Sequence, residues 1–212
     1  ALTVLTRSIR SMSQEERQAI FAPAAATGLE ASLRDVAVAV YSQADDSPEH
    51  EAVLRGIANT MVETDNGELI LIGNGIEQWL NGRALAQAGD YQAAETEFDD
   101  AERLLSIYPS PGLFFDQGVA HAELGEIDEA LAYLERVAGE NDYHGRAVIL
   151  NLPAWRERVS AFVVCRPELL ARWSAGPAAY PALAALLPTP TVTPTPTLTP
   201  RPTNTSAVSP TP

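Results

Sequence analysis

Apolar residues recur at helical spacing in two stretches of the chain, residues 91–108 and 127–137. In the first stretch they are three or four residues apart, which places them on one face of an α-helix: Tyr91, Ala94, Phe98, Ala101, Leu105 and Tyr108. The second stretch repeats the opening of this series with Ile127, Ala130, Leu134 and Val137. Each stretch therefore predicts a helix that buries one face.

The two stretches belong to a longer pattern with a period of 36 residues, which separates Gly82 from Gly118 and Gly89 from Gly125. Gly89 and Gly125 are each followed by an acidic residue. Glycine accepts the left-handed backbone at the end of one helix, and an acid suits the start of the next. A fixed period of this length predicts repeat architecture. The alternative is two unrelated helical hairpins that share their turn residues.

At these residues the chain resembles the tetratricopeptide repeat family. The first copy matches the family at Trp79, Gly82, Gly89, Asp90, Tyr91, Ala94, Phe98 and Ala101, and the second at Phe114, Gly118, Gly125, Ala130 and Leu134. The leucine expected before the glycine of the first helix is replaced by Asn81 in one copy and by Gln117 in the other. The resemblance implies an all-α fold, an α-solenoid of antiparallel helical hairpins, and says little about the ligand.

Further helices are expected before the two repeats, which occupy residues 68–139. Residues 1–27 read as an N-terminal helical lead-in with a capping box at Ser13, and residues 28–67 as a third hairpin whose second helix begins at Pro48. Residues 68–72 could form a short strand. A helix is favoured there, because a lone strand would leave its backbone hydrogen bonds unmade.

Residues 140–175 are expected to close the stack as capping helices, with a short helix at 143–150 and another at Pro153. Pro167 is expected to kink or restart the second of these helices. Terminal repeats usually present a polar outer face. The residues expected to supply it are Arg156, Arg158, Arg166 and Arg172.

Residues 176–212 lose this pattern and become a proline- and threonine-rich linker, predicted to be disordered or extended. Such a tract extends by about 3.1 Å per residue as polyproline II and resembles the stalks of surface proteins. Asn204 opens an N-glycosylation acceptor, Asn-Thr-Ser, although a chance match is favoured in so threonine-rich a tract.

Charge narrows the possible partners. The net charge is −14, and residues 76–139 alone hold 13 Asp and Glu against 3 Arg. An acidic surface repels phosphate backbones and anionic lipid headgroups, so a protein or peptide partner is expected rather than nucleic acid. No run of 18 apolar residues occurs, so no membrane insertion is expected. The lone Cys165 is expected to be a small buried residue, and the start at Ala1 fits a processed chain or a fragment of a longer protein.

No catalytic or cofactor motif stands out. His50 lies between two glutamates and is expected to be solvated, whereas His121 should be a half-buried packing residue. His144 has no cysteine or second histidine nearby, so no zinc signature exists. The carboxylates at 99, 100 and 102 are expected to form a solvated charge run. The sequence therefore predicts a protein that is not an enzyme and needs no metal or other cofactor.

The resemblance implies that the first helix of each repeat lines a concave groove that binds a protein or peptide. The groove residues carried over are Trp79, Arg83, Gln87, Phe115, Asp116, Val119 and Glu123. Trp79 and Phe115 fit equally well as core residues between repeats. The resulting hypothesis is a non-catalytic interaction scaffold, exported or held at a bacterial surface. The alternatives are a cytoplasmic location, a sensor or assembly domain of a larger membrane-anchored protein, or a structural spacer.

Overall fold

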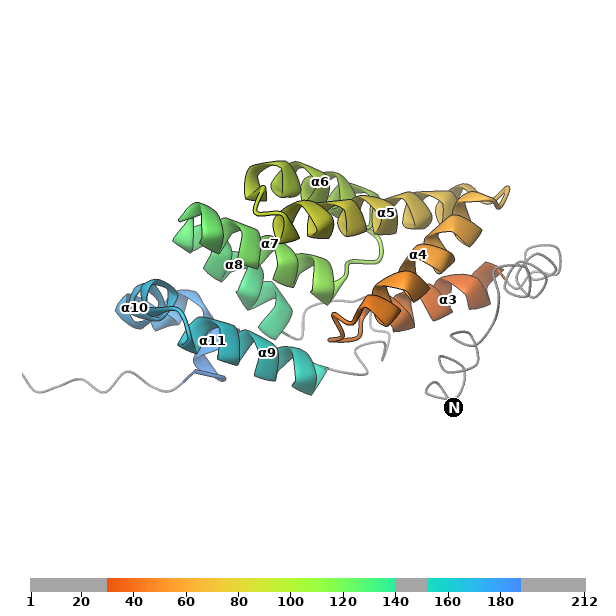
Figure 1. Ribbon diagram of the computed structural model, residues 1–212. Helices are drawn as coiled ribbons and strands as arrows, with labels where there is room; N and C mark the ends of the chain where they lie inside the picture. Colours follow the sequence, from red (N-terminus) through yellow and green to blue (C-terminus); the bar gives the residue numbers. More distant parts are fainter. Residues whose placement is uncertain (1–29, 140–151, 188–212) are drawn as a thin grey trace, which may run out of the picture.

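The computed structural model describes residues 30–139 and 152–187, and every regular element in these ranges is helical (Figure 1). The elements are α3 (Glu30–Tyr41), α4 (Pro48–Val62), α5 (Gly67–Gln87), α6 (Tyr91–Leu104), α7 (Pro111–Leu124), α8 (Ile127–Ala138), α9 (Leu152–Val164), α10 (Pro167–Ala175), the 3₁₀ turn η1 (Pro177–Ala179) and α11 (Pro181–Ala184). The all-α prediction is therefore confirmed for the described residues. The predictions for 1–27, 143–150 and Asn204, and for residues 188–212 of the expected linker, lie outside them. For residues 176–187 the linker prediction is wrong: they form η1 and α11, and Tyr180, Leu183 and Leu187 are buried in the C-terminal core because prolines begin short helices there rather than an extended tract.

The turns of the two repeats have the same backbone geometry. Gly89 ends the α5–α6 turn with φ 84° and Gly125 ends the α7–α8 turn with φ 82°, both left-handed. The Asp90 N–H donates to the carbonyl of Leu85 at 3.0 Å, and the equivalent bond after Gly125 measures 2.9 Å. These bonds satisfy carbonyls that a helix end would leave unpaired. The prediction that both glycines end a helix is confirmed.

Small residues let the two helices of each pair approach closely. A Cβ placed on Gly82 of α5 would lie 2.5 Å from the ring of Phe98 and 3.2 Å from the carbonyl oxygen of Ala94. On Gly118 of α7 it would lie 3.1 Å from Leu134 and 3.3 Å from the oxygen of Ala130. Positions 36 residues apart thus make the same helix contact in α5–α6 and in α7–α8.

The hairpin predicted over residues 28–67 corresponds to α3 and α4. Ser47 caps α4 by accepting the His50 N–H, and Pro48 begins the helix. Ala58 of α4 is fully buried, like Ala94 and Ala130 at the same interval along the chain. The turn of this hairpin does not follow the period, however, because Val53, one period before Gly89, lies inside α4.

Two helix boundaries near α5 and α6 depend on local chemistry. The side chain of Asn66 accepts the N–H groups of Glu68 and Leu69, so α5 begins at Gly67 and residues 68–72 are helical, as favoured. The stripe expected to continue helically to Tyr108 instead ends with α6 at Leu104. Tyr108 precedes Pro109, which disfavours the helical backbone at that position.

The C-terminal helices pack against α8, and α9 also reaches back to the α3–α4 turn. The indole N–H of Trp155 on α9 donates to the carbonyl of Ser42 at 2.7 Å, and Arg158 forms an ion pair with Asp46. Ala44 of this turn joins the same apolar cluster as Trp155. Pro167 restarts the chain as a separate helix, α10.

The structure departs from what the sequence predicted for the C-terminal arginines, for Cys165 and for His50. Of the four arginines expected on an outer polar face, three are partly buried against other elements: Arg156 donates to the carbonyl of Ala138, Arg158 pairs with Asp46 of the α3–α4 turn, and Arg166 pairs with Glu123 of α7. Arg172 is exposed, and it pairs with Asp128 of α8. Cys165 is exposed, because α9 ends one residue before it. His50 is buried, since the first turn of α4 lies against the core.

Among the described residues, none of the helices is long and apolar enough to cross a membrane.

Candidate functional site

The first helices of the two repeats, α5 and α7, present one shared face that α9 partly covers. Trp79 and Phe115 occupy equivalent positions on α5 and α7, and both are buried. The Phe115 ring lies 5.8 Å from Trp155 and 5.6 Å from Phe162, both on α9. Gly112 of α7 leaves room for the Trp79 ring, because a Cβ there would lie 2.6 Å from it. These aromatic residues are therefore packed, as the alternative interpretation expected.

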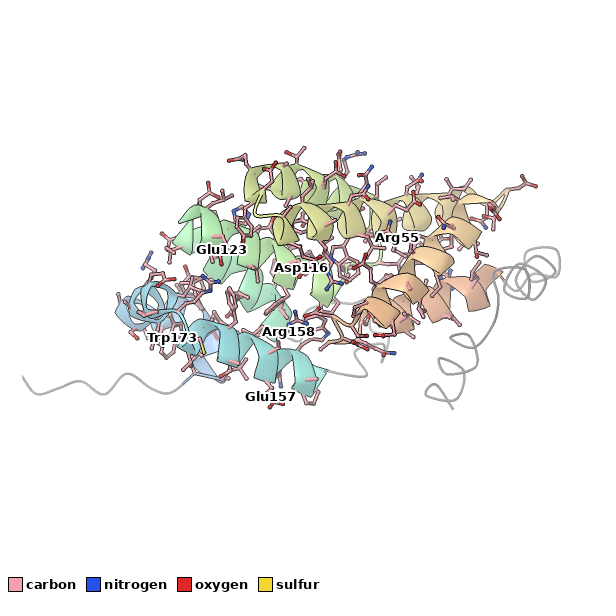
Figure 2. The ribbon with its side chains drawn as sticks, in the orientation of Figure 1. Arg55, Asp116, Glu123, Glu157, Arg158 and Trp173 are labelled. Atoms are coloured by element: carbon pink, nitrogen blue, oxygen red, sulfur yellow. The ribbon has the colours of Figure 1, made fainter. Side chains whose placement is uncertain are left out.

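Arg83 and Asp116 lie on the same face and form one polar network with Trp79. Asp116 accepts the Trp79 indole N–H at 2.7 Å, and its carboxylate lies 3.4 Å from Nε of Arg83. Arg83, with only 8% of its side chain exposed, also pairs with Asp46 at 3.0 Å, and Arg158 approaches Asp46 from α9. Figure 2 shows Asp116 on α7 and Arg158 on α9, on facing helices.

Burial sets the ionisation of Asp116. Desolvation raises its pKa to about 6, and the nearby charge of Asp46 acts in the same direction. The Arg83 charge and the Trp79 hydrogen bond lower the pKa and offset part of this effect. An acid with a perturbed pKa often marks a functional site, although structural ion-pair networks perturb pKa values too.

The other predicted groove residues lie apart from this network. Val119 is half-buried against the C-terminal core, and Glu123, near the end of α7, pairs with Arg166. Gln87 is exposed at the end of α5. The structure thus brings Trp79, Arg83 and Asp116 together beside Phe115, and leaves Gln87 and Glu123 at helix ends. Their role in binding a partner stays a prediction.

A second polar network, which the sequence did not predict, connects α6, α7 and α8. Glu102 accepts hydrogen bonds from Gln117 at 2.9 Å, Tyr133 at 3.3 Å and Arg136 at 2.8 Å. Burial raises the pKa of Glu102, but these hydrogen bonds and the Arg136 charge outweigh burial and leave the pKa below its usual value. Glu102 therefore does not belong to a solvated charge run, and Gln117 is polar at a leucine position because it binds Glu102.

This network borders a cavity of about 220 Å³ between the end of α6, the start of α7 and α8. Its lining combines apolar side chains with the ion pair of Glu102 and Arg136, and the remaining residues are Leu105, Ser106, Pro109, Leu113 and Phe114. The Arg136 guanidinium lies 3.6 Å from the centre of the Phe114 ring. The cavity is partly open and could hold a side chain of a partner.

Helix α6 carries four carboxylates, called here the α6 acidic surface: Glu95, Asp99, Asp100 and Glu102. Glu95 and Glu102 are partly exposed, because they lie where α6 meets His121 and Gln117 of α7. Asp99 and Asp100 are exposed. Burial raises the pKa of the Tyr133 phenol, and the nearby charges of Glu102 and Asp99 raise it further. The equivalent positions on α8 include Leu131 and Ala138, which are buried beneath the C-terminal helices. Four positions that are all acidic on α6 thus hold two buried apolar residues on α8, together with the charged Glu135 and Arg136.

His121 is more buried than the sequence predicted, and it is paired. Its Nδ1 lies 2.7 Å from a carboxylate oxygen of Glu126 and 4.0 Å from one of Glu95. Among the described residues, these three side chains form the one group whose ligand atoms could converge on a metal ion. Sequence spacing did not reveal it, because Glu95 comes from a different helix.

Comparisons with protein-family models, with curated proteins and with solved structures gave no match. The resemblance to tetratricopeptide repeats therefore rests on the residues of this chain alone.

Proposed function

We propose that this chain is a non-catalytic protein-interaction module built as a tetratricopeptide-like solenoid, and that its partner is a basic protein segment. The solenoid is supported by the helix contacts and turn geometry that recur after 36 residues in α5–α6 and α7–α8. Repeats of this kind stack neighbour on neighbour and offer extended surfaces to partners.

The observation that carries the choice of partner is the charge of the repeat surface. All three arginines within residues 76–139 are in ion pairs: Arg83 with Asp46 and Asp116, Arg103 with Asp100, and Arg136 with Glu102. The surface of this part of the chain is therefore dominated by carboxylates. Such a field attracts basic segments and speeds their association.

The binding surface proposed is the α6 acidic surface together with the cavity beside it. The face of α5 and α7 is partly occupied by Trp155, Arg158 and Phe162, so a partner has less access there. On α8, Glu135 shows that a carboxylate at this repeat position can bind another segment. It accepts the N–H groups of Ala182 and Leu183 at the start of α11. Asp99 stands at the equivalent position of α6 and is exposed.

The location proposed is outside the cytoplasm, with the module held away from its attachment by the proline- and threonine-rich residues 188–212. The composition of that tract supports this location, since such tracts act as semi-rigid spacers. Protease treatment of intact cells followed by immunodetection tests it. A module that is protected until the cells are lysed would contradict exposure at the cell surface, and protection that survives selective opening of an outer membrane would contradict a location outside the cytoplasm.

The test of the function is binding of a fluorescein-labelled arginine-rich peptide to the full chain, compared with an uncharged peptide of equal length. Neutralising Asp99 and Asp100 together, as Asp99→Asn and Asp100→Asn, should weaken binding of the basic peptide by about 3- to 10-fold, because each exposed charge contributes about 0.2–1 kcal/mol. The affinity should also fall as salt rises.

The matched control removes the same charge from a distant exposed site, as Glu63→Gln and Asp65→Asn after α4. This variant should bind the basic peptide like the unchanged chain. An equal loss in both variants would mean attraction by net charge alone and would refute the surface. Binding of neither peptide would favour the structural spacer.

A further inference from the structure

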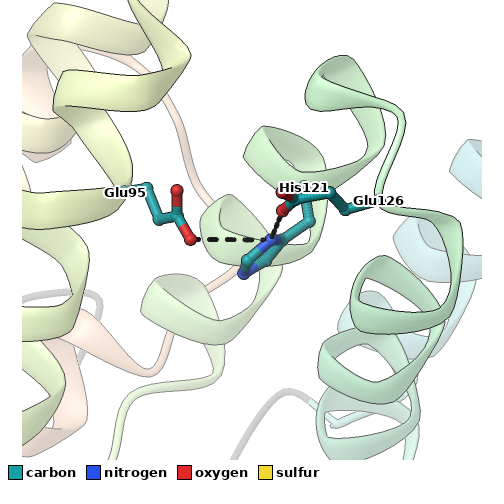
Figure 3. Close-up of side chains that lie close together, drawn as sticks. All are labelled: Glu95, His121 and Glu126. Carbon is teal, nitrogen blue, oxygen red and sulfur yellow. Dashed lines mark hydrogen bonds and ion pairs between the residues drawn. The ribbon is translucent and has the colours of Figure 1, made fainter.

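The cluster of Glu95, His121 and Glu126 lies where α6 meets the α7–α8 turn, as Figure 3 shows. Glu95 comes from the second turn of α6, His121 from the last turn of α7, and Glu126 follows the turn glycine. The ligand atoms of the three side chains lie within 4.8 Å of one another. The cluster thus joins the second helix of one repeat to the next repeat.

His121 is held in place more firmly than the two carboxylates. Its ring stacks on Tyr133 with centroids 5.2 Å apart and planes 12° apart, and its side chain is 8% exposed. The Glu126 N–H donates to the His121 carbonyl at 2.9 Å, which fixes the backbone between the two residues. The side chains of Glu95 and Glu126 are 24% and 46% exposed, so they can adjust and can be reached from solvent.

The other repeat shows that these side chains are not required by the packing. One period from His121 and Glu95 stand Leu85 and Leu131, which pack in the apolar cores. One period from Glu126 stands Asp90, whose side chain caps α6 by accepting the Ala93 N–H. Glu126 makes no such cap to α8 and approaches His121 instead. At all three positions the residue thus differs from its equivalent one period away, and the three side chains lie close together.

We propose that Glu95, His121 and Glu126 bind a divalent first-row transition metal ion, with zinc as the reference case. One imidazole nitrogen and two carboxylate oxygens are a ligand set used for such ions, and three protein ligands leave a further position for water. Ligands bound to zinc at about 2.0–2.2 Å lie at most roughly 4 Å apart, so Glu95 must move slightly inward. The ion would neutralise two neighbouring carboxylates and tie α6 to the α7–α8 turn.

The experiment is a calorimetric titration of the full chain with zinc chloride, made in a Cys165→Ser background so that the exposed thiol does not compete. A saturable site of one ion per chain is expected, together with a melting temperature that rises with zinc, because an ion that binds the folded state stabilises it. Magnesium, which prefers an all-oxygen octahedron, should bind much more weakly.

The variants Glu95→Gln and Glu126→Gln should each weaken zinc binding at least about tenfold, since even outer-shell partners of a metal are worth about 10- to 100-fold. Glu129→Gln, an exposed glutamate on α8, removes the same charge and should leave binding unchanged. His121→Phe keeps a ring that can stack on Tyr133 but offers no ligand, so it should abolish the zinc-dependent rise in melting temperature.

Equal zinc binding in the chain with and without Glu95→Gln and Glu126→Gln would overturn the proposal, and so would the absence of saturable binding up to about millimolar zinc. These two substitutions lie on partly exposed side chains. They keep the test decisive even if His121→Phe fails to fold. Substitution of cobalt for zinc gives a second readout, because a visible absorption band that is lost in Glu126→Gln reports direct ligation.

Discussion

Gly82 and Gly118 are equivalent residues with different neighbours, and the difference makes their substitution by alanine unequal. At Gly82 the added Cβ would come within 2.5 Å of the rigid Phe98 ring, whereas at Gly118 it meets the flexible end of Leu134 at 3.1 Å. Alanine gains about 1 kcal/mol of helix propensity at either site. We expect Gly82→Ala to lower the free energy of unfolding by about 1–3 kcal/mol and Gly118→Ala to change it by less than about 1 kcal/mol. Urea denaturation measures both.

The control for this prediction gives the first repeat the leucine that the second repeat has at the equivalent position. Phe98→Leu places a leucine opposite residue 82, as Leu134 lies opposite residue 118. In that background, Gly82→Ala should lower the free energy of unfolding by less. Contacting residues usually couple by about 0.5–3 kcal/mol in such a double-mutant cycle. Additive effects of the two substitutions would show that the Phe98 contact does not explain the glycine.

The raised pKa of Asp116 predicts that its contribution to stability falls as pH rises. Its pKa in the folded chain is raised to about 6 from a reference value of 3.8. Between these two values the folded state binds a proton that the unfolded state has lost, so this residue stabilises the fold less as pH rises and its full penalty applies above about pH 6.

Asp116→Asn removes this titration and keeps an oxygen that can accept the Trp79 N–H. Relative to the unchanged chain, the variant should therefore gain about 1–3 kcal/mol of unfolding free energy between about pH 4 and pH 7. Urea denaturation of both chains at the two pH values measures this gain. Effects of the substitution that do not depend on pH cancel when the values at the two pH values are subtracted. A difference that does not change with pH would mean that Asp116 titrates normally.

At the level of helices, the sequence predicted most of the helix starts and ends that depend on residues close by in the chain. The turn glycines and the N-terminal prolines of α4 and α10 act within a few residues, so Gly89, Gly125, Pro48 and Pro167 mark element ends correctly. The end of α6 was placed too late, because a hydrophobic stripe does not reveal that Tyr108 has left the helix. Local signals thus define the helices better than hydrophobic periodicity does.

The candidate site was predicted only where its residues share a helical face. Trp79 and Arg83 are four residues apart on α5, and the period of the repeat brings Asp116 beside them. The burial of this network by α9 could not be predicted, because Trp155 and Arg158 meet residues more than 100 positions earlier in the chain. Glu95 was likewise missed as a neighbour of His121, since a single sequence does not show which residues of different helices meet.

At the level of the whole molecule, α9 connects the two ends of the described chain. It packs on α8, contacts Phe115 through Trp155 and Phe162, and reaches Ser42 and Asp46 at the α3–α4 turn. An open solenoid joins each repeat only to its neighbours and can unfold from its ends. A chain whose last helices also hold its first pair should unfold more cooperatively.

This cooperativity can be measured by hydrogen exchange in a Trp155→Ala variant. The substitution removes a buried ring and the hydrogen bond to Ser42, which should cost about 3–5 kcal/mol of local stability. We expect faster exchange in two places that are distant in sequence, α9 to α11 and the N–H groups of the α3–α4 turn, with α6 much less affected. Val164→Ala, at an exposed position on the same helix, is the control and should change neither region. Faster exchange confined to α9 to α11 would mean that these helices only cover the end of the stack, because the contact with Ser42 and Asp46 would then contribute nothing to holding α3 and α4.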